Sequence, residues 1–377
     1  KAGGIGTVTK IVAEELVRSG HNVSVIGYYP DIKESYVDEC INGVRVIRHN
    51  LGYRNTRLKE RLFILLRSLG ISGFITKREL SYIEDKIDAY IHDNQIDILE
   101  LTDYYPFILC DSPLEFKKFS VPTVLRIHGS ASFIQNLSGR GKKAYDANAE
   151  RHFQRCDQVS AVSAYSMSYV QDNFKLPDIK SWNVIYNPIE DSFLKKSDPV
   201  DNDNVLFIGK LTETKGCYSL IKAFNICAEQ NPNLHLRLAG KGDEDILKSM
   251  IDPRFIDRVH FLGYCDRERL KEEIDNCSFA CIPSYFESFG MVAIEVMARN
   301  RTIIYTDRTA ASELIHDSIE GYLVNPDNIG EIADKVNALV SSHGLRDDMA
   351  DNAYKRVLNK FCASAIVSEL VSLYSSL

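Results

Sequence analysis

Two glutamates lie eight positions apart in the stretch FESFGMVAIEVMA, which runs from Phe286 to Ala298. From Met291 to Ala298 every residue except Glu295 is apolar, which is typical of a buried helix. A buried carboxylate is costly unless it is paired or hydrogen-bonded. We therefore expect Glu295 to have a partner inside this helix, and we expect Glu287 to lie in the loop before it.

The helix should begin beside these carboxylates. Ser288 is a good N-cap residue, so the sequence predicts a helix that starts near Phe289. The backbone N–H groups around Phe289, Gly290 and Met291 then point into the space between the two glutamates. Amide donors next to carboxylate acceptors suit a ligand that carries both phosphates and hydroxyls, such as a nucleotide sugar.

Glycine and lysine residues follow other predicted strands. Lys210 and Lys215 flank the short loop GKLTETKG, and the next helix opens at Gly216. Two cations near a helix N-terminus make an anion site suited to a diphosphate. The alternative interpretation is a pair of solvated surface lysines. The loop is not a Walker motif. Gly240, in LAGKGD, permits close approach of the backbone to a ligand.

The start of the chain carries a further glycine loop. Gly3 and Gly4 precede an amphipathic helix predicted over Thr9–Ser19, where backbone amides favour an anion, although an ordinary tight turn has the same composition. A strand should precede such a loop, so we expect that strand either upstream of Lys1 or missing from the sheet. His128 ends another predicted strand, and it is either a site residue or a structural histidine.

Short apolar strands alternate with helical patterns along the whole chain, which predicts α/β domains with parallel sheets. We expect two doubly wound Rossmann-like domains that face a central cleft, over residues 1–187 and 188–360, with a C-terminal helix at 361–377 that packs back toward the first domain. The segment 188–203 has the composition of a linker. The predicted strands cover 22–27, 44–48, 96–101, 121–128, 158–163, 183–186, 205–209, 234–239, 259–262, 279–283, 302–306 and 321–324.

Composition excludes several classes of protein. The net charge of −7 argues against nucleic-acid binding. Residues 1–187 hold 24 Lys/Arg against 22 Asp/Glu, whereas residues 188–377 hold 21 against 30, and this difference suggests two halves with different surroundings. Nine cysteines without a CxxC pair fit reduced thiols in a cytoplasmic protein. No apolar run is long enough for a transmembrane helix, and no signal peptide is visible.

One segment of the first half is strongly basic. Residues 54–78 hold seven Lys/Arg against Glu60 alone, with Leu58, Leu62, Leu65 and Leu66 at helical spacing. A basic helix with a leucine-rich face is typical of an interfacial helix. We expect a peripheral contact with an anionic membrane surface here, and the alternative is a core helix with a solvated basic face.

These motifs together resemble the retaining glycosyltransferases of family 4, which have the GT-B fold. The resemblance extends over nearly the whole chain, except residues 50–120. It is carried by Glu287-x7-Glu295, by the glycine loop at 3–6, by the His128 strand end, and by VSAYS at 162–166, YNPIE at 186–190, GKLTETKG at 209–216, LAGKGDE at 238–244 and FLGY at 261–264.

The resemblance implies a role for each candidate residue. Glu295 would bind the ribose hydroxyls of a nucleotide-diphosphate-sugar donor, Lys210 and Lys215 its diphosphate, and Glu287 and His128 its sugar. Lys210 stands where family members often have arginine. A lysine keeps the positive charge but lacks the bidentate fork of the guanidinium. The implied catalytic residues are Glu287, His128 and Lys215. The implied donor-binding residues are Gly3, Gly4, Gly209, Lys210, Lys215, Gly240, Tyr264, Ser288, Phe289, Gly290, Met291, Val292 and Glu295.

The resemblance also implies the reaction. Transfer would retain the anomeric configuration and would need no metal or other cofactor, because lysines and a helix N-terminus stabilise the leaving diphosphate. We favour front-face attack over a covalent intermediate on Glu287. The expected acceptor is a cell-envelope or surface glycan, either free or attached to a lipid carrier. The alternatives are a transferase that acts on a small soluble metabolite, a non-catalytic sugar-nucleotide binder, and a dinucleotide-dependent oxidoreductase, which is disfavoured because no strand is followed by GxGxxG.

Overall fold

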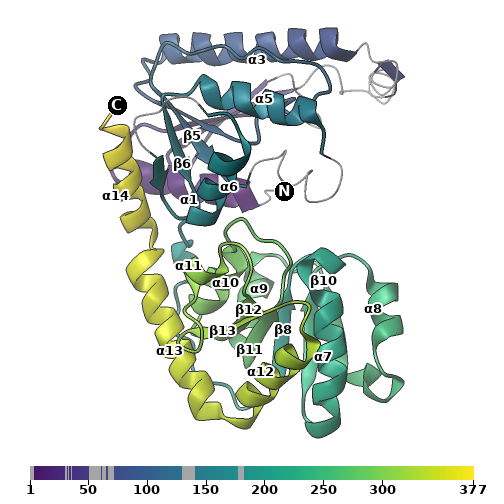
Figure 1. Ribbon diagram of the computed structural model, residues 1–377. Helices are drawn as coiled ribbons and strands as arrows, with labels where there is room; N and C mark the ends of the chain where they lie inside the picture. Colours follow the sequence, from purple (N-terminus) through teal and green to yellow (C-terminus); the bar gives the residue numbers. More distant parts are fainter. Residues whose placement is uncertain are drawn as a thin grey trace. The chain divides into compact units, whose positions relative to one another are not determined.

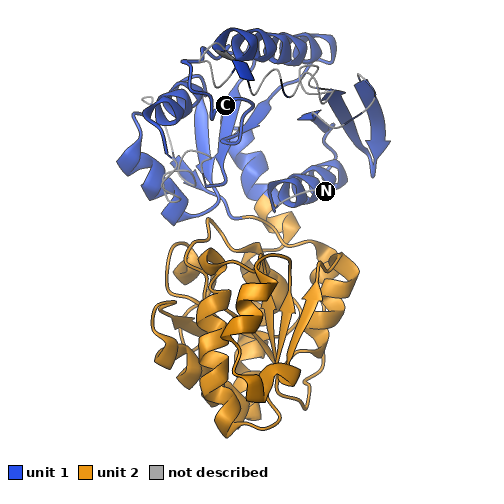
Figure 2. Ribbon diagram, turned by 90° about the vertical axis from the view of Figure 1, so that its right-hand side faces the viewer, with its two compact units in different colours: residues 1–186, 367–377 blue, residues 187–366 orange. Residues whose placement is uncertain are grey.

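The computed structural model describes residues 4–29, 32, 34, 36–50, 61, 65–66, 72–129, 141–176 and 182–377. It divides into two compact units (Figure 2). Unit 1 comprises Lys1–Tyr186 together with Val367–Leu377, and unit 2 comprises Asn187–Ile366. Within the described residues, none of the helices combines the length and the apolar composition that crossing a bilayer demands.

The N-terminal part of unit 1 is a helix followed by a small mixed sheet. α1 (Gly4–Arg18) precedes β1 (Ser24–Tyr29), β2 (Tyr36–Ile41) and β3 (Val44–Asn50), in the order β1-β3-β2. β1 and β3 are parallel, whereas β2 and β3 form an antiparallel hairpin. We did not predict β2 from the sequence, although the hairpin turns at Asn42-Gly43, where both residues have positive φ (51° and 83°), as a type I′ turn requires.

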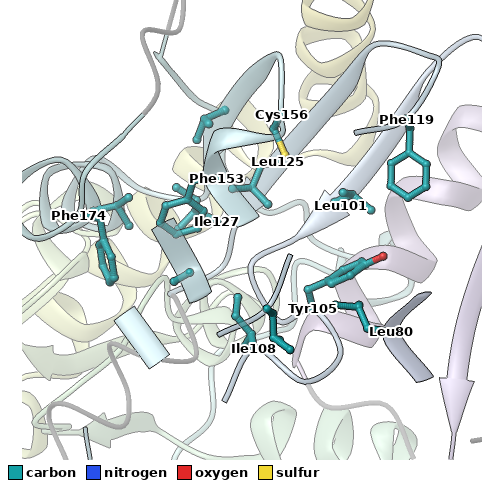
Figure 3. Close-up of a cluster of buried hydrophobic side chains, with 14 of the residues drawn as sticks. Leu80, Leu101, Tyr105, Ile108, Phe119, Leu125, Ile127, Phe153, Cys156 and Phe174 are labelled. Carbon is teal, nitrogen blue, oxygen red and sulfur yellow. The ribbon is translucent and has the colours of Figure 1, made fainter. Parts of the chain in front are cut away.

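A parallel sheet forms the rest of unit 1. Its strands are β4 (Leu99–Thr102), β5 (Thr123–Ile127), β6 (Gln158–Ala161) and β7 (Trp182–Val184), in sequence order. The helices of this part are α3 (Ser72–Asp93), α5 (Lys143–Gln154) and α6 (Ala164–Asn173), as labelled in Figure 1. Leu80 of α3, Phe153 of α5 and Leu125 of β5 are fully buried in one apolar cluster, shown in Figure 3. This cluster fixes the carboxyl ends of β4 and β5, where His128 is found.

Unit 2 is a six-stranded parallel sheet in the order β10-β9-β8-β11-β12-β13. Its strands are β8 (Asn204–Ile208), β9 (His235–Ala239), β10 (Val259–Gly263), β11 (Phe279–Ile282), β12 (Thr302–Thr306) and β13 (Gly321–Val324). All six strands predicted in this half are confirmed. The strand order reverses between β8 and β11, and ligands bind parallel sheets at such a switch point, beyond the carboxyl ends of the strands.

Helices connect all these strands. α7 (Cys217–Gln230) and α12 (Ile329–Ser341) pack against each other, and α10 (Met291–Met297) packs on β12 and on α13 (His343–Lys360). The remaining helices are α8 (Glu244–Met250), α9 (Arg267–Asn276), α11 (Ala311–Leu314) and α14 (Ala363–Tyr374). Both units therefore have the α/β, Rossmann-like architecture that the sequence predicts.

The chain enters unit 2 through a packed segment. Ile189 pairs with Cys362 in a parallel bridge, and Ile189 and Phe193 are fully buried. A short 3-10 turn, η1 (Asp191–Phe193), follows Glu190. Near the end of the chain, the hydroxyl of Tyr374 donates a hydrogen bond of 2.6 Å to Glu100 of β4, within unit 1.

Candidate active site

Two loops of unit 2 meet at the switch point. The 3-10 turn η2 (Glu213–Lys215) follows β8, and the segment 283–290 follows β11. The carbonyl oxygen of Thr214 accepts hydrogen bonds from the backbone N–H of Tyr285 (3.0 Å) and from the hydroxyl of Ser284 (3.3 Å). These bonds hold the two loops together, so that the side chains they carry come into contact.

The side chains in contact are Lys215 and Glu287. The Nζ atom of Lys215 lies 2.7 Å from Oε1 of Glu287 and 3.3 Å from the carbonyl oxygen of Phe286. Both side chains are partly accessible, with exposed fractions of 30% and 20%. A cation and a carboxylate that sequence analysis assigned to one site are therefore paired directly, and a solvent-borne ligand can reach both.

The start of α10 differs from the prediction. We expected Ser288 to be the N-cap and the helix to begin near Phe289, but this prediction was wrong. The N-cap is Gly290, with φ 105° and ψ 54°, and the helix begins at Met291. The reason is the left-handed turn at Gly290, which L side chains rarely adopt and which delays the first helical residue. Ser288 lies two positions before the cap.

Tyr305 of β12 explains why this turn carries a glycine. A Cβ atom at Gly290 would lie 2.4 Å from the Tyr305 hydroxyl, far inside contact distance. Tyr305 is buried, and its hydroxyl has no hydrogen-bond partner among the described residues. Burial, together with the charge of Glu287, raises its pKa well above the ordinary value, so the hydroxyl stays protonated. The Tyr305 hydroxyl therefore lies close against the backbone of Gly290, at the end of the loop between Glu287 and α10.

Glu295 lies in the middle of α10 and is only 6% exposed. Burial raises its pKa to about 7, and the nearby Arg267 opposes that shift. The Nη1 atom of Arg267 lies 3.4 Å from Oε1 of Glu295. The partner that the sequence required is thus an arginine at the first position of α9. Its Nη2 atom also lies 2.5 Å from Oε2 of Glu190, in the segment that opens unit 2.

The loops after β8 and β9 continue the sheet beyond the strand ends. The backbone N–H of Gly209 donates to Ala239 (3.0 Å), and Leu211 donates to Lys241 (3.0 Å). A Cβ atom at Gly240 would lie 1.7 Å from the carbonyl oxygen of Gly209, so this approach requires glycine. The packing leaves Lys210 exposed at the end of β8. Tyr264, directly after β10, exposes 67% of its surface.

The candidate residues of unit 1 have a separate environment. Buried Asp103, which follows β4, accepts hydrogen bonds from the backbone N–H groups of His128 (3.0 Å) and Gly129 (3.1 Å). Burial and the charge of Arg126 lower the pKa of His128 to about 3, so its imidazole is neutral at physiological pH. The helix predicted from Thr9 begins instead at Gly4, whose amide is among the first-turn groups without an intrahelical acceptor. Gly3 lies outside the described residues.

The structure thus groups the sequence-predicted residues by unit. Unit 2 pairs Lys215 with Glu287. It places Gly209, Lys210, Gly240 and Tyr264 after the carboxyl ends of its strands, Gly290 at the N-cap of α10, and Glu295 within α10. His128 and Gly4 belong to unit 1. Sequence reasoning missed Arg267, Asp103 and Tyr305. Asp103 had a readable signal, since it lies two positions after the predicted strand 96–101, as His128 lies at the end of the predicted strand 121–128. Over the described part of the chain, no three His, Cys, Asp or Glu side chains gather as metal ligands.

Two Rossmann-like units, with glycine turns, lysines and carboxylates at the carboxyl ends of the second sheet, define the GT-B class of glycosyltransferases. The chain belongs to glycosyltransferase family 4, whose family model matches residues 2–193. A second model, glycosyl transferases group 1, matches residues 189–356.

Similar proteins agree with this assignment. An uncharacterized glycosyltransferase of Methanocaldococcus jannaschii is 29% identical over 99% of this chain and 94% of its own length. A capsular polysaccharide biosynthesis glycosyltransferase of Staphylococcus aureus is 28% identical over 50% of each chain. Among solved structures, sucrose-phosphate synthase of Thermosynechococcus elongatus has the same fold, with a TM-score of 0.79 and 19% identity over 100% of this chain and 94% of its own. The predicted GT-B fold is confirmed.

Proposed function

We propose that this protein transfers a sugar, with retention of anomeric configuration and without a metal ion, from a nucleotide-diphosphate-sugar donor to a hydroxyl group of a glycan. The observation that carries the proposal is the direct pairing of Lys215 with Glu287 at the switch point of unit 2. A cation there suits a diphosphate, and a carboxylate next to it suits sugar hydroxyls.

In this proposal the donor binds along the carboxyl ends of the unit 2 strands. Lys210 and Lys215 bind the diphosphate, and Glu295 accepts hydrogen bonds from the ribose hydroxyls. Glu287 and the backbone of Ser288–Val292 hold the sugar. The base lies near Gly240 and Tyr264, where the exposed phenol ring offers a stacking surface. Gly209 allows the backbone after β8 to approach the phosphates closely.

The proposed mechanism is front-face attack. The bond between C1 of the sugar and the diphosphate oxygen breaks, and the acceptor oxygen forms its bond to C1 on the same face. The acceptor proton passes to an oxygen of the leaving phosphate. Lys210 and Lys215 stabilise the negative charge that develops on that phosphate. His128, whose imidazole is neutral, contributes a hydrogen bond to the sugar rather than a charge.

We further propose that the acceptor is a cell-envelope or surface glycan on a lipid carrier, which the enzyme meets from the cytoplasmic side. Support comes from the capsule-biosynthesis relative. The basic segment 54–78 would contact the anionic membrane surface; most of it lies outside the described residues. In its described part, Phe74 at the start of α3 is 77% exposed, with Lys77 and Arg78 exposed beside it. An exposed aromatic ring among cations suits a lipid interface.

A thermal-shift screen against UDP-, GDP- and ADP-sugars tests the proposed donor. A ligand that binds only the folded state raises the melting temperature by mass action, so the sugar nucleotide that responds identifies the base. Failure of all three classes at millimolar concentration would contradict the proposal. An NMR analysis of the product then reports whether the anomeric configuration is retained.

A further inference from the structure

Arg267 holds Glu295 by a contact that the family motif does not include. Its guanidinium reaches the buried carboxylate from α9, with Nη1 of Arg267 and Oε1 of Glu295 3.4 Å apart. Among the described residues, Arg267 is the cation that forms an ion pair with Glu295. The side chain of Glu295 is 8% exposed, whereas that of Arg267 is 38% exposed. Arg267 is therefore the more accessible member of the pair.

The guanidinium is fixed by further contacts. Its Nη2 atom lies 2.5 Å from Oε2 of Glu190, and its central carbon lies 4.6 Å from the ring centre of Phe193. The side chain of Asp266 accepts a hydrogen bond from the backbone N–H of Arg269, which caps α9 and sets Arg267 at the first helical position. One arginine thus joins the buried carboxylate of α10 to the segment 189–193, where the chain enters unit 2.

We infer that Arg267 is a positioning residue for donor binding: by its pairing with both Glu295 and Glu190, it orients the Glu295 carboxylate to accept the two ribose hydroxyls, and its positive charge favours the carboxylate over the carboxylic acid. This inference rests on the proposed function for the identity of the ligand. The electrostatic link between the three side chains is independent of the proposed function, because it involves no ligand.

Burial and two neighbouring charges determine whether Glu295 is protonated or ionised. Burial favours the protonated form of Glu295, Arg267 favours the ionised form, and Glu190 opposes ionisation. These are the charged groups that act on Glu295 from α9 and from the segment after Tyr186. An ionised carboxylate accepts hydrogen bonds through both oxygens, whereas a protonated one uses part of that capacity to donate. Donor affinity should therefore rise as Glu295 loses its proton.

Two substitutions should have opposite effects. Removing the cation in Arg267→Met should move the pH midpoint of Glu295 ionisation upward by about one unit or more, the usual effect of an adjacent opposite charge. Removing the competing carboxylate in Glu190→Gln should move it downward. Arg267→Lys keeps the charge and should restore most of the wild-type midpoint. Arg269→Met is the matched control, because Arg269 lies on the same helix and pairs with Glu273 rather than with Glu295.

The test has one arm without ligand and one with it. In the first arm, the melting temperature of each variant is compared with that of the same variant carrying Glu295→Gln, across the pH range, so that the difference reports the ionisation of Glu295. In the second arm, calorimetry measures the affinity for the nucleotide sugar found in the screen. Arg267→Met should weaken binding about fivefold near pH 7, with a loss that shrinks at higher pH as Glu295 ionises.

The outcomes separate the inference from the proposed function. Opposite shifts for Arg267→Met and Glu190→Gln in both arms support it. An unshifted midpoint in the first arm overturns it, whatever the affinities are. A loss of affinity that is equal at every pH also overturns it, since that would show only a structural role. If the midpoints shift but the wild type binds no nucleotide sugar, the ribose assignment and the proposed function fail, and the electrostatic link remains.

Discussion

The ammonium group of Lys215 and the carboxylate of Glu287 form an ion pair of 2.7 Å between the loops that follow β8 and β11. These strands are neighbours at the point where the strand order of unit 2 reverses. Because both side chains are partly accessible, the pair can exchange partners when an anion arrives: Lys215 can turn to a phosphate, and Glu287 to a hydroxyl.

Gly290 and Tyr305 should be energetically coupled. Gly290→Ala places a Cβ atom 2.4 Å from the Tyr305 hydroxyl and adds a side chain at φ 105°. The clash should lower the free energy of unfolding by about 1–3 kcal/mol. The backbone strain should lower it by about another 1–2 kcal/mol. In a Tyr305→Phe background the clash with the hydroxyl should disappear, which leaves the strain and the tight contacts of the new Cβ atom with Leu314 Cδ1 (3.1 Å) and the ring carbon Cζ of residue 305 (3.2 Å).

Chemical denaturation of the two single variants and the double variant measures this coupling. Gly263→Ala is the matched control, because Gly263 has φ 67° but open space around its Cβ position, so it should show strain alone. Additive costs for Gly290→Ala and Tyr305→Phe would contradict the contact between the two residues.

Glu295→Gln should stabilise the ligand-free protein most at alkaline pH. The pKa of Glu295 is raised by burial from 4.5 to about 7, so between these values the folded state keeps a proton that the unfolded chain has lost. Wild-type stability therefore falls as pH rises through this window, and the cost is fully present above it. A neutral glutamine avoids the cost, which is on the order of 3 kcal/mol.

Thermal or urea unfolding of both proteins across the pH range provides the measurement. The difference between variant and wild type should be small at the acid end and reach its maximum above neutrality. A difference that does not change with pH would show that the buried carboxylate does not titrate in this range.

Sugar transfer should proceed in the presence of EDTA. Lysines rather than a bound cation stabilise the leaving diphosphate in the proposed mechanism. Initial rates with EDTA, and with added magnesium or manganese, should be similar. Activity abolished by the chelator and restored by manganese would contradict metal-independent transfer.

The protein should bind vesicles that contain anionic lipid and leave them at high salt. Each Lys or Arg near an anionic surface contributes about 1 kcal/mol, so replacement of Arg57, Lys59, Arg61 and Arg67 by serine should release the protein in a flotation assay. The matched control replaces Lys222, Lys241, Lys248 and Arg254 of unit 2, which are exposed and carry the same charge. Equal recovery with neutral and anionic vesicles would instead favour a soluble acceptor.

The sequence predicted the parallel sheets because buried strands leave short apolar runs between helical patterns, and every strand of unit 2 follows that rule. It failed where one residue changes the backbone locally. Ser288 has the composition of an N-cap, but the left-handed turn at Gly290 moves the cap by two positions. The strand β2 was missed because two adjacent acidic residues, Asp38 and Glu39, interrupt its apolar residues, and only the Asn42-Gly43 turn marks it.

The candidate site was predictable where the pattern is local, and not where it depends on tertiary contacts. The burial of Glu295 follows from its apolar neighbours, so the need for a partner could be stated in advance. The identity of that partner could not, because Arg267 precedes Glu295 by 28 positions and reaches it only in the folded structure, from the start of α9. The same applies to Tyr305, which looks like an ordinary strand residue until its hydroxyl is seen against Gly290.

Donor binding to unit 2 is the central claim, and calorimetric titration of the wild type, Lys215→Ala and Glu295→Ala with the nucleotide sugar from the screen tests it most directly. Each substitution should weaken binding by about 1.5–3 kcal/mol, the usual value of a hydrogen bond to a charged group. Lys222→Ala, on the exposed face of α7, should bind like the wild type. Wild-type affinity in both Lys215→Ala and Glu295→Ala would contradict the site.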